Sequence, residues 1–404
     1  MNKMNRSVAL HNLGCKVNAY ELGKITETLR EKGYTIVPFS ESADIYVINT
    51  CTVTNIADRK SRQMLHRAKT KNPKALVVAL GCFVDTDPEG VKKDDCIDVA
   101  LGNKEKGRLA EVLATYEDSF FAESDATPRC EASPAPHART RAFVKIQDGC
   151  NLFCSYCIIP FARGRSISRT PEEVTEEVRA LAAQGIKEIV LTGIHLSSYD
   201  GAAKDGNALQ GLIGALNRID GLERIRLGSL EPRLVTEKTV EAFVSADKLC
   251  PHFHLSLQSG SDAVLQRMRR RYTTKEYAAV VAMLRKAYAQ PAITTDLITG
   301  FPGETGREFE ESRAFVEEMQ FYETHVFPFS ARKGTTAYDM EGQLTQAEKK
   351  ARADVLIRMG MESAHRYREQ FLGKPLRVLW EEAGTVAGKR LLTGYTERYV
   401  RVGI

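Results

Sequence analysis

Three cysteines lie close together in the chain with the spacing C-x3-C-x2-C, and no fourth cysteine lies near them. They are Cys150, Cys154 and Cys157, called the cluster triplet below. Each thiolate can anchor one iron of a [4Fe–4S] cube, so three thiolates leave the fourth iron open for a ligand that is not protein. A structural zinc site needs four ligands, and a catalytic three-cysteine zinc site usually comes with a helix-borne His or Glu. The spacing therefore favours an open-iron cluster and radical chemistry over zinc or three unrelated core cysteines.

A second set of cysteines is spread over the N-terminal part of the chain. Cys15, Cys51 and Cys82, called the auxiliary trio below, each follow an apolar segment, at residues 7–13, 44–49 and 74–80. In a parallel sheet these positions converge at the carboxyl edge, where ligands of α/β folds bind. Spacing alone leaves a second explanation open, in which the trio consists of three separate buried core cysteines.

The elements that would position the auxiliary trio alternate between strands and helices over residues 6–112. Apolar runs occur at residues 7–13, 34–39, 44–49 and 74–80, and helical patterns at residues 18–31 and 57–71 lie between them. This alternation predicts a parallel sheet covered by helices.

Alternation resumes after residue 142, where the clearest helix start in the chain is found. Thr170 is the expected N-cap, Pro171 takes the first helical position and Glu173 completes a capping box. Six parallel strands with connecting helices predict an open, partial (β/α)6 barrel. The expected strands are residues 142–147, 188–191, 224–227, 252–257, 292–298 and 325–329.

Composition limits the possible classes of protein. The 404 residues are 43% apolar and 27% charged, which is typical of a soluble chain with two or three domains. The chain has no uncharged apolar stretch of about 18 residues, so no membrane span is predicted. Its start has no signal-peptide pattern, so we expect a cytoplasmic protein. Nine cysteines, an odd number, argue against a disulfide framework. Cys96, Cys130 and Cys250 are expected to be structural or incidental, and the net charge of +5 permits a nucleic-acid partner.

The sequence segments around both cysteine sets resemble those of a known family. VKIQDGCNLFCSYCIIPFARGRSISR resembles the radical S-adenosylmethionine (SAM) superfamily and its methylthiotransferase branch, and NLGCKVNAYE, INTCTVT and ALGCF resemble the N-terminal domain of that branch. The resemblance implies two [4Fe–4S] clusters. One, on the cluster triplet, binds SAM and yields a 5′-deoxyadenosyl radical; the other, on the auxiliary trio, handles sulfur. It also implies an N-terminal domain at 5–116, a linker at 117–135, a radical SAM core at 136–366 and a short β segment at 371–404.

Polar residues at the expected strand ends are candidate SAM contacts, because strand ends at one edge of a barrel face its site. Ordinary polar strand ends are the alternative explanation for each of them. The basic run at residues 267–271 can face phosphate or the carboxylate of SAM, although a solvated helical face explains it more simply. The strand-end candidates are Gly193, Ser229, Glu231, Gln258 and Asp296, and Tyr156, which lies between the cysteines of the triplet, is a further candidate because its ring can shield the cluster or a bound nucleoside.

The sequence segments NTCTVTNIADRKSRQ and GCKVNAYE most resemble those of the branch that modifies threonylcarbamoyladenosine beside the tRNA anticodon. That substituent carries a carboxylate, which Arg59, Lys60 or Arg62 can pair with. The implied partners are this tRNA, an electron donor and a sulfur source. The alternatives are isopentenyladenosine in tRNA, an aspartate of a ribosomal protein, or a non-catalytic iron–sulfur sensor that binds RNA.

The C-terminal segment LRVLWEEAGTVAGKRLLTGYTERYVRV resembles the start of a TRAM domain, a small RNA-binding β-barrel. Residues 371–404 supply fewer strands than such a barrel needs, so we expect a TRAM-like segment with an incomplete barrel. Tyr395, Arg398, Tyr399 and Arg401 have side chains suited to RNA.

Overall fold

The computed structural model describes residues 6–120, 140–201, 207–386 and 388–404. Its N-terminal part is a parallel five-stranded sheet with strand order β2-β1-β3-β4-β5. The central strands IYVINT and LVVALG are buried along their whole length, as expected for parallel strands covered on both faces. The strands are β1 (Ser7–Asn12), β2 (Thr35–Val37), β3 (Ile45–Thr50), β4 (Leu76–Gly81) and β5 (Val99–Leu101).

Helices cover both faces of this sheet. Ile25 and Leu29 of α1 (Lys16–Glu31) share one apolar core with Leu109 of α5 (Leu109–Phe120), while Leu65 of α2 (Asn55–Lys71) packs on the other face. Because α5 continues to Phe120, the first residues of the expected linker are helical. The rest of that linker up to residue 139, with Cys130, lies outside the described residues. The shorter elements are α3 (Cys82–Thr86), α4 (Pro88–Lys92) and η1 (Lys106–Arg108).

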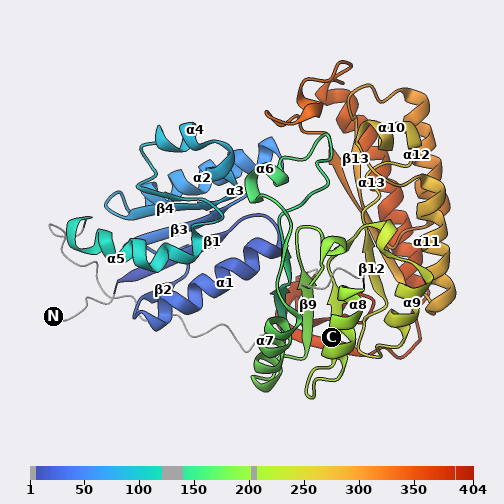
Figure 1. The fold of residues 1–404 in the computed structure, drawn as a ribbon, viewed down its shortest axis with the longest axis horizontal. Coiled ribbons are helices and arrows are strands. Elements are labelled where there is room, and N and C mark those ends of the chain that lie inside the picture. The colour runs from blue at the N-terminus through green and yellow to red at the C-terminus, as the bar shows by residue number, and fades with distance from the viewer. Residues whose placement is uncertain (1–5, 121–139, 202–206, 387) are drawn as a thin grey trace.

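The second part of the chain contains the six expected parallel strands and one short additional strand, β11 (Ser229–Leu230). They form two neighbouring sheets, with orders β10-β9-β6 and β11-β12-β13-β14, joined by a parallel bridge between Ile225 and Leu249. Together they form an open, curved sheet with helices on its outer side (Figure 1). The strands are β6 (Arg141–Lys145), β9 (Glu188–Thr192), β10 (Arg224–Leu227), β11 (Ser229–Leu230), β12 (His252–Leu255), β13 (Ala292–Thr299) and β14 (Glu323–Pro328).

The outer helices begin where their capping residues predict. The capping box of Thr170 and Glu173 opens α7 (Pro171–Ala183), with Pro171 at the first position. Three later helices start with a threonine N-cap and a glutamate in the same arrangement. Every described helix is too short or too polar to pass through a bilayer. The remaining helices are α8 (Ala208–Asn217), α9 (Glu237–Val244), α10 (Asp262–Arg267), α11 (Thr274–Ala287), α12 (Gly306–Met319) and α13 (Gln346–Glu369).

The C-terminal segment is a three-stranded antiparallel sheet of β15 (Val378–Val386), β16 (Lys389–Thr396) and β17 (Arg401–Gly403). It packs against the amino-terminal edge of the barrel strands. Arg224, the first residue of β10, donates from Nη1 to the carbonyl oxygen of Tyr395 at 2.9 Å. His252, the first residue of β12, has its ring centroid 5.2 Å from that of Tyr399. The segment therefore closes one end of the barrel.

Three of the tail residues whose side chains suit RNA binding instead contact other residues of the protein. The rings of Tyr395 and Tyr399 stack at 4.6 Å, and the Arg141 guanidinium lies over both. Arg398 donates from Nε to the carbonyl oxygen of Gln290 at 2.9 Å. These three tail side chains thus have intramolecular packing roles.

Candidate active site

The cluster triplet lies on the loop that joins β7 (Gln147–Asp148) to α6 (Ile159–Arg163). Gly149 opens the loop with φ +68°, and a Cβ at this position would lie 2.0 Å from the carbonyl oxygen of Arg165. Only glycine fits this turn without strain. The Ser155 hydroxyl anchors the middle of the loop by donating to the carbonyl oxygen of Arg267 at 2.8 Å. The sequence thus holds the three cysteines on one short, anchored loop.

The thiols of the triplet are close enough to influence each other's ionisation. Burial raises the pKa of Cys150, although the amide of Leu152 points at its Sγ from 3.5 Å. Burial raises the pKa of Cys157 to about 12, with further contributions from the thiolates of Cys154 and Cys150. Without metal, burial favours the protonated form of Cys150 and Cys157, and a bound cluster would hold both as thiolates. The donor set fits a three-thiolate cluster.

Arg270 is a site residue that sequence analysis missed. Its side chain is 6% exposed, and Nη1 lies 3.3 Å from the Sγ of Cys154. Nη2 lies 3.9 Å from a carboxylate oxygen of Glu231, and Nε donates to the Tyr272 hydroxyl at 3.1 Å. The sequence signal was the basic run 267–271, which had been explained by a solvated face. One arginine of that run instead points at a cluster ligand.

Replacement of Arg270 by methionine is expected to lower 5′-deoxyadenosine release from SAM by about 10–100-fold, the usual cost of losing a residue that supports a metal ligand. Chromatography of SAM reaction products, beside iron content, measures the effect. Arg271→Met is the matched control, because Arg271 belongs to the same run and is exposed. Equal rates for both variants would assign Arg270 to packing alone.

Glu231, a candidate SAM contact at a strand end, is linked to the cluster triplet through Arg270. Its Oε2 lies 3.0 Å from Nε2 of His195. Burial by itself raises the pKa of Glu231, but the hydrogen bond to His195 and the charge of Arg270 outweigh burial and lower it. An ionised carboxylate at the mouth of the barrel suits a cationic ligand group.

The other expected SAM contacts have local partners of their own. A Cβ on Gly193 would lie 2.9 Å from Oε1 of Gln147, so this glycine admits the Gln147 side chain. Gln258 has φ +73° and donates its backbone N–H to the carbonyl oxygen of Asp296. Asp296 is opposite His325 in register and lies 3.2 Å from Nε2 of His254. Tyr156 packs edge-on against Phe301, and Ser229 is exposed at the start of β11.

The auxiliary trio gathers at the carboxyl edge of the N-terminal sheet. Cys15 caps α1 just after β1, Cys51 directly follows β3, and Cys82 directly follows β4 as the first residue of α3. Strands β1, β3 and β4 are neighbours, so the three cysteines lie on adjacent strand ends. The structure thus brings the three cysteines to the carboxyl edge of the sheet, as the parallel arrangement predicts.

The backbone around the trio is shaped to bring the thiols together. Gly14 has φ +97°, and a Cβ there would lie 2.9 Å from both Cβ and Sγ of Cys51. Burial raises the pKa of Cys51 to about 11, and the thiolates of Cys82 and Cys15 add to the effect. Three mutually interacting thiols with space made by a glycine fit a second three-thiolate cluster.

Cys82 of the auxiliary trio is connected across the boundary between the two parts of the chain to the helix that follows the cluster triplet. The Asn103 amide nitrogen lies 3.5 Å from the Sγ of Cys82 and donates to the carbonyl oxygen of Ala162 at 3.0 Å. Ala162 belongs to α6, which begins just after Cys157, and α6 packs against α3. One amide therefore connects a ligand of the auxiliary trio to the helix that follows the cluster triplet.

The three basic residues expected to meet the substrate differ in their surroundings. Arg62 is paired with Asp87 at 2.5 Å and lies over the Phe83 ring at 5.0 Å. Arg59 and Lys60 are exposed and have no hydrogen-bond or ion-pair partner within the described ranges. Arg59 lines an open hollow at the start of α2, the helix that follows Cys51. Of the three, Arg59 is the cation available to a ligand beside the auxiliary trio.

Family comparisons divide the chain at the same place as the fold. Residues 144–316 match the Radical SAM superfamily, and residues 7–102 match the group described as Uncharacterized protein family UPF0004. Among solved structures, the radical S-adenosylmethionine methyltransferase TsrM from Kitasatospora setae shares the fold, with a TM-score of 0.60 and 17% identity over 83% of this chain and 77% of that one.

Curated relatives align along nearly the whole chain. The Threonylcarbamoyladenosine tRNA methylthiotransferase MtaB of Bacillus subtilis is 40% identical over 98% of this chain and 90% of its own. The protein of the same name from Aquifex aeolicus is 37% identical over 98% of each chain. The tRNA-2-methylthio-N(6)-dimethylallyladenosine synthase of Syntrophotalea carbinolica is 34% identical over 93% of this chain and 88% of its own.

Proposed function

Because this chain belongs to the radical SAM methylthiotransferase family, we propose that it adds a methylthio group to C2 of threonylcarbamoyladenosine in tRNA. The observation that carries the proposal is the presence of two sets of three cysteines in one chain, one at adjacent strand ends and one on the β7–α6 loop, with Asn103 connecting Cys82 to α6. The names of the relatives at 37–40% identity support the threonylcarbamoyl substrate.

The reaction needs a radical, because the hydrogen on the target carbon is not acidic and a base cannot remove it. When bound, SAM with its [4Fe–4S] cluster supplies the radical, and the auxiliary cluster supplies the sulfur. The cluster triplet would hold the first cluster, and the auxiliary trio the second. Arg270 and Glu231 would orient the first site, together with SAM contacts drawn from Tyr156, Gly193, Ser229, Gln258 and Asp296.

The same proposal assigns the parts of the chain. The N-terminal domain at 5–116 would handle sulfur, the core at 136–366 would generate the radical, and the segment at 371–404 would close the barrel. The protein would work in the cytoplasm, where tRNA, an electron donor and a sulfur source meet. The donor and the sulfur source are required by the chemistry, since both are consumed in each turnover.

Arg59→Ala is expected to weaken binding of an anticodon-loop RNA that carries threonylcarbamoyladenosine by about tenfold, and to affect the same RNA with plain adenosine far less. Arg59 lines the hollow at the start of α2 and has no ion-pair or hydrogen-bond partner in the described part of the chain, and a hydrogen bond to a charged group contributes about 1.5–3 kcal/mol. Titration of both RNAs measures the difference. Lys60→Ala, the neighbouring unpaired cation, is the control. Equal losses on both RNAs would make Arg59 a phosphate contact.

Mass spectrometry of tRNA nucleosides tests the proposed function. A strain that lacks the gene should lose methylthio-threonylcarbamoyladenosine and retain threonylcarbamoyladenosine without the methylthio group. The intact gene should restore the methylthio form. An unchanged level of methylthio-threonylcarbamoyladenosine in the deletion strain would refute the proposal. Loss of methylthio from isopentenyladenosine, or from a ribosomal aspartate, would assign the chain to another branch. A chain that binds RNA but never releases 5′-deoxyadenosine would be a sensor.

A further inference from the structure

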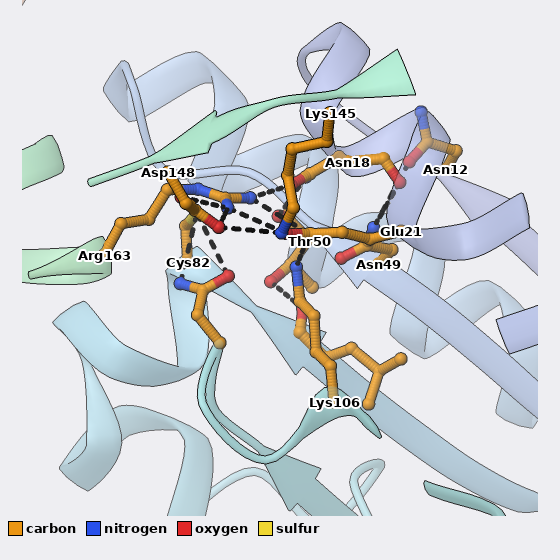
Figure 2. Close-up of polar contacts among 12 residues, drawn as sticks. Asn12, Asn18, Glu21, Asn49, Thr50, Cys82, Lys106, Lys145, Asp148 and Arg163 are labelled. Atoms are coloured by element: carbon orange, nitrogen blue, oxygen red, sulfur yellow. Dashed lines mark hydrogen bonds and ion pairs between the residues drawn. The ribbon is translucent and has the colours of Figure 1, made fainter. Parts of the chain in front are cut away.

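Arg163, the last residue of α6, is buried between the two parts of the chain (Figure 2). Its side chain is 1% exposed. Nη1 lies 3.0 Å from a carboxylate oxygen of Glu21 on α1 and 3.0 Å from one of Asp148 on β7. Nη2 donates to the Asn18 side chain. The guanidinium therefore joins the first helix of the N-terminal domain to the strand that precedes the cluster triplet.

Two lysines share the same carboxylates. Lys106 lies 2.7 Å from Glu21, and Lys145 lies 2.8 Å from Glu21 and 2.9 Å from Asp148. Burial alone raises the pKa of Glu21, but these cations outweigh it and lower that pKa, so Glu21 is ionised. Three cationic side chains thus contact only two carboxylates, those of Glu21 and Asp148. The network is short of negative charge.

The network lies next to Cys82. Helix α6, which ends at Arg163, packs against α3, whose first residue is Cys82. The Asn103 amide nitrogen lies 3.5 Å from the Sγ of Cys82 and donates to the carbonyl oxygen of Ala162, the residue before Arg163. The Nε of Arg163 is buried and has no hydrogen-bond partner among the described residues. Asp85, the next nearby carboxylate, accepts hydrogen bonds from Asn103 instead, and burial raises its pKa. A buried, unpartnered N–H donor and surplus cations are costly unless an anion completes the network.

A cluster held by three thiolates is such an anion, because the thiolates outweigh the positive charge of an oxidised cluster core. Net charge and hydrogen bonds to sulfur set the reduction potential of iron–sulfur clusters. We propose that Arg163 is a positioning residue that supplies the counter-charge for the auxiliary cluster and locks that cluster against the loop of the cluster triplet. This inference rests on the proposed auxiliary cluster.

The test uses the full-length chain with all three triplet cysteines changed to alanine, so that only the auxiliary cluster can form. Its reduction potential is measured by redox titration with electron paramagnetic resonance. Arg163→Met removes a positive charge and is expected to shift the potential to more negative values. Glu21→Gln removes a negative charge from the same network and is expected to shift it the opposite way. A merely structural role predicts no such pair of opposite shifts.

Arg169→Met is the matched control, because Arg169 also lies between the two parts but pairs with Glu177 and Tyr20. Its potential should equal that of the parent. Shifts of Arg163→Met and Glu21→Gln in the same direction, or no shift in a loaded cluster, would overturn the inference. If Arg163→Met holds no cluster, Glu21→Gln decides alone, with an unchanged potential as the refuting result. A parent chain that takes up no cluster would refute the auxiliary site itself.

Discussion

Cys154→Ala is expected to reduce 5′-deoxyadenosine release from SAM to the background seen without enzyme. Cys154 is the buried central member of the cluster triplet, and the Arg270 guanidinium points at its sulfur from 3.3 Å. Alanine offers no ligand, and two thiolates cannot anchor the three irons that must be held while the fourth stays open. The variant should also lose about four irons per chain after anaerobic reconstitution.

The control for this prediction is Cys96→Ala, which changes a half-buried cysteine outside both sets. It should keep the parent's iron content and its rate of SAM cleavage. Metal analysis after reconstitution separates the explanations for the triplet. A Cys154→Ala chain that still cleaves SAM at the parent rate would show that the triplet does not carry the radical chemistry. Zinc in place of iron in the parent would show the same.

Cys51→Ala is expected to separate the two halves of the reaction. The parent should release 5′-deoxyadenosine and methylthiolate the RNA, whereas the variant should release 5′-deoxyadenosine and leave the RNA unmodified. Cys51 directly follows the buried strand β3, and its loss removes one of three ligands from the auxiliary trio without touching the triplet. Iron content should fall by about half, because one of two similar clusters is lost.

Paired assays of one sample measure this separation, with nucleoside mass spectrometry for the RNA and chromatography for 5′-deoxyadenosine. Cys250→Ala is a suitable control, since Cys250 is also buried but belongs to neither set. Methylthiolated RNA formed by Cys51→Ala at the parent level would contradict the assignment of the auxiliary trio. Loss of both products together would mean that Cys51 supports the whole fold.

The positions of the six cysteines followed from local patterns. Cys51 and Cys82 come straight after continuous apolar runs, and adjacent parallel strands bring such positions to one edge. The Thr170 capping box and the barrel strands are local signals of the same kind. Periodicity and caps report on neighbours in sequence, so they were enough for the elements and for the edge on which the site lies.

Contacts between distant residues could not be predicted in this way. Arg270 turns inward because Arg269 before it adopts φ +59°, and the sequence RMRRR does not say which arginine takes that conformation. Arg163 meets Glu21 across the domain boundary, and no local pattern links them. Tyr399 looked suited to RNA because an aromatic ring beside arginines has the same composition in an RNA site and in a packed interface.

The C-terminal sheet bears on how the family can be re-engineered. Arg224 and Arg226, inside the barrel, direct their guanidinium groups to backbone carbonyls of the tail, and Glu188 is buried beside Arg226 at 2.9 Å. Removing residues 371–404 would take the tail carbonyls away from both guanidinium groups and leave them with Glu188 at an open barrel end. The tail is therefore not an interchangeable module. A chimera that takes its tail from a relative will remain folded only if the matching barrel residues are transferred with it.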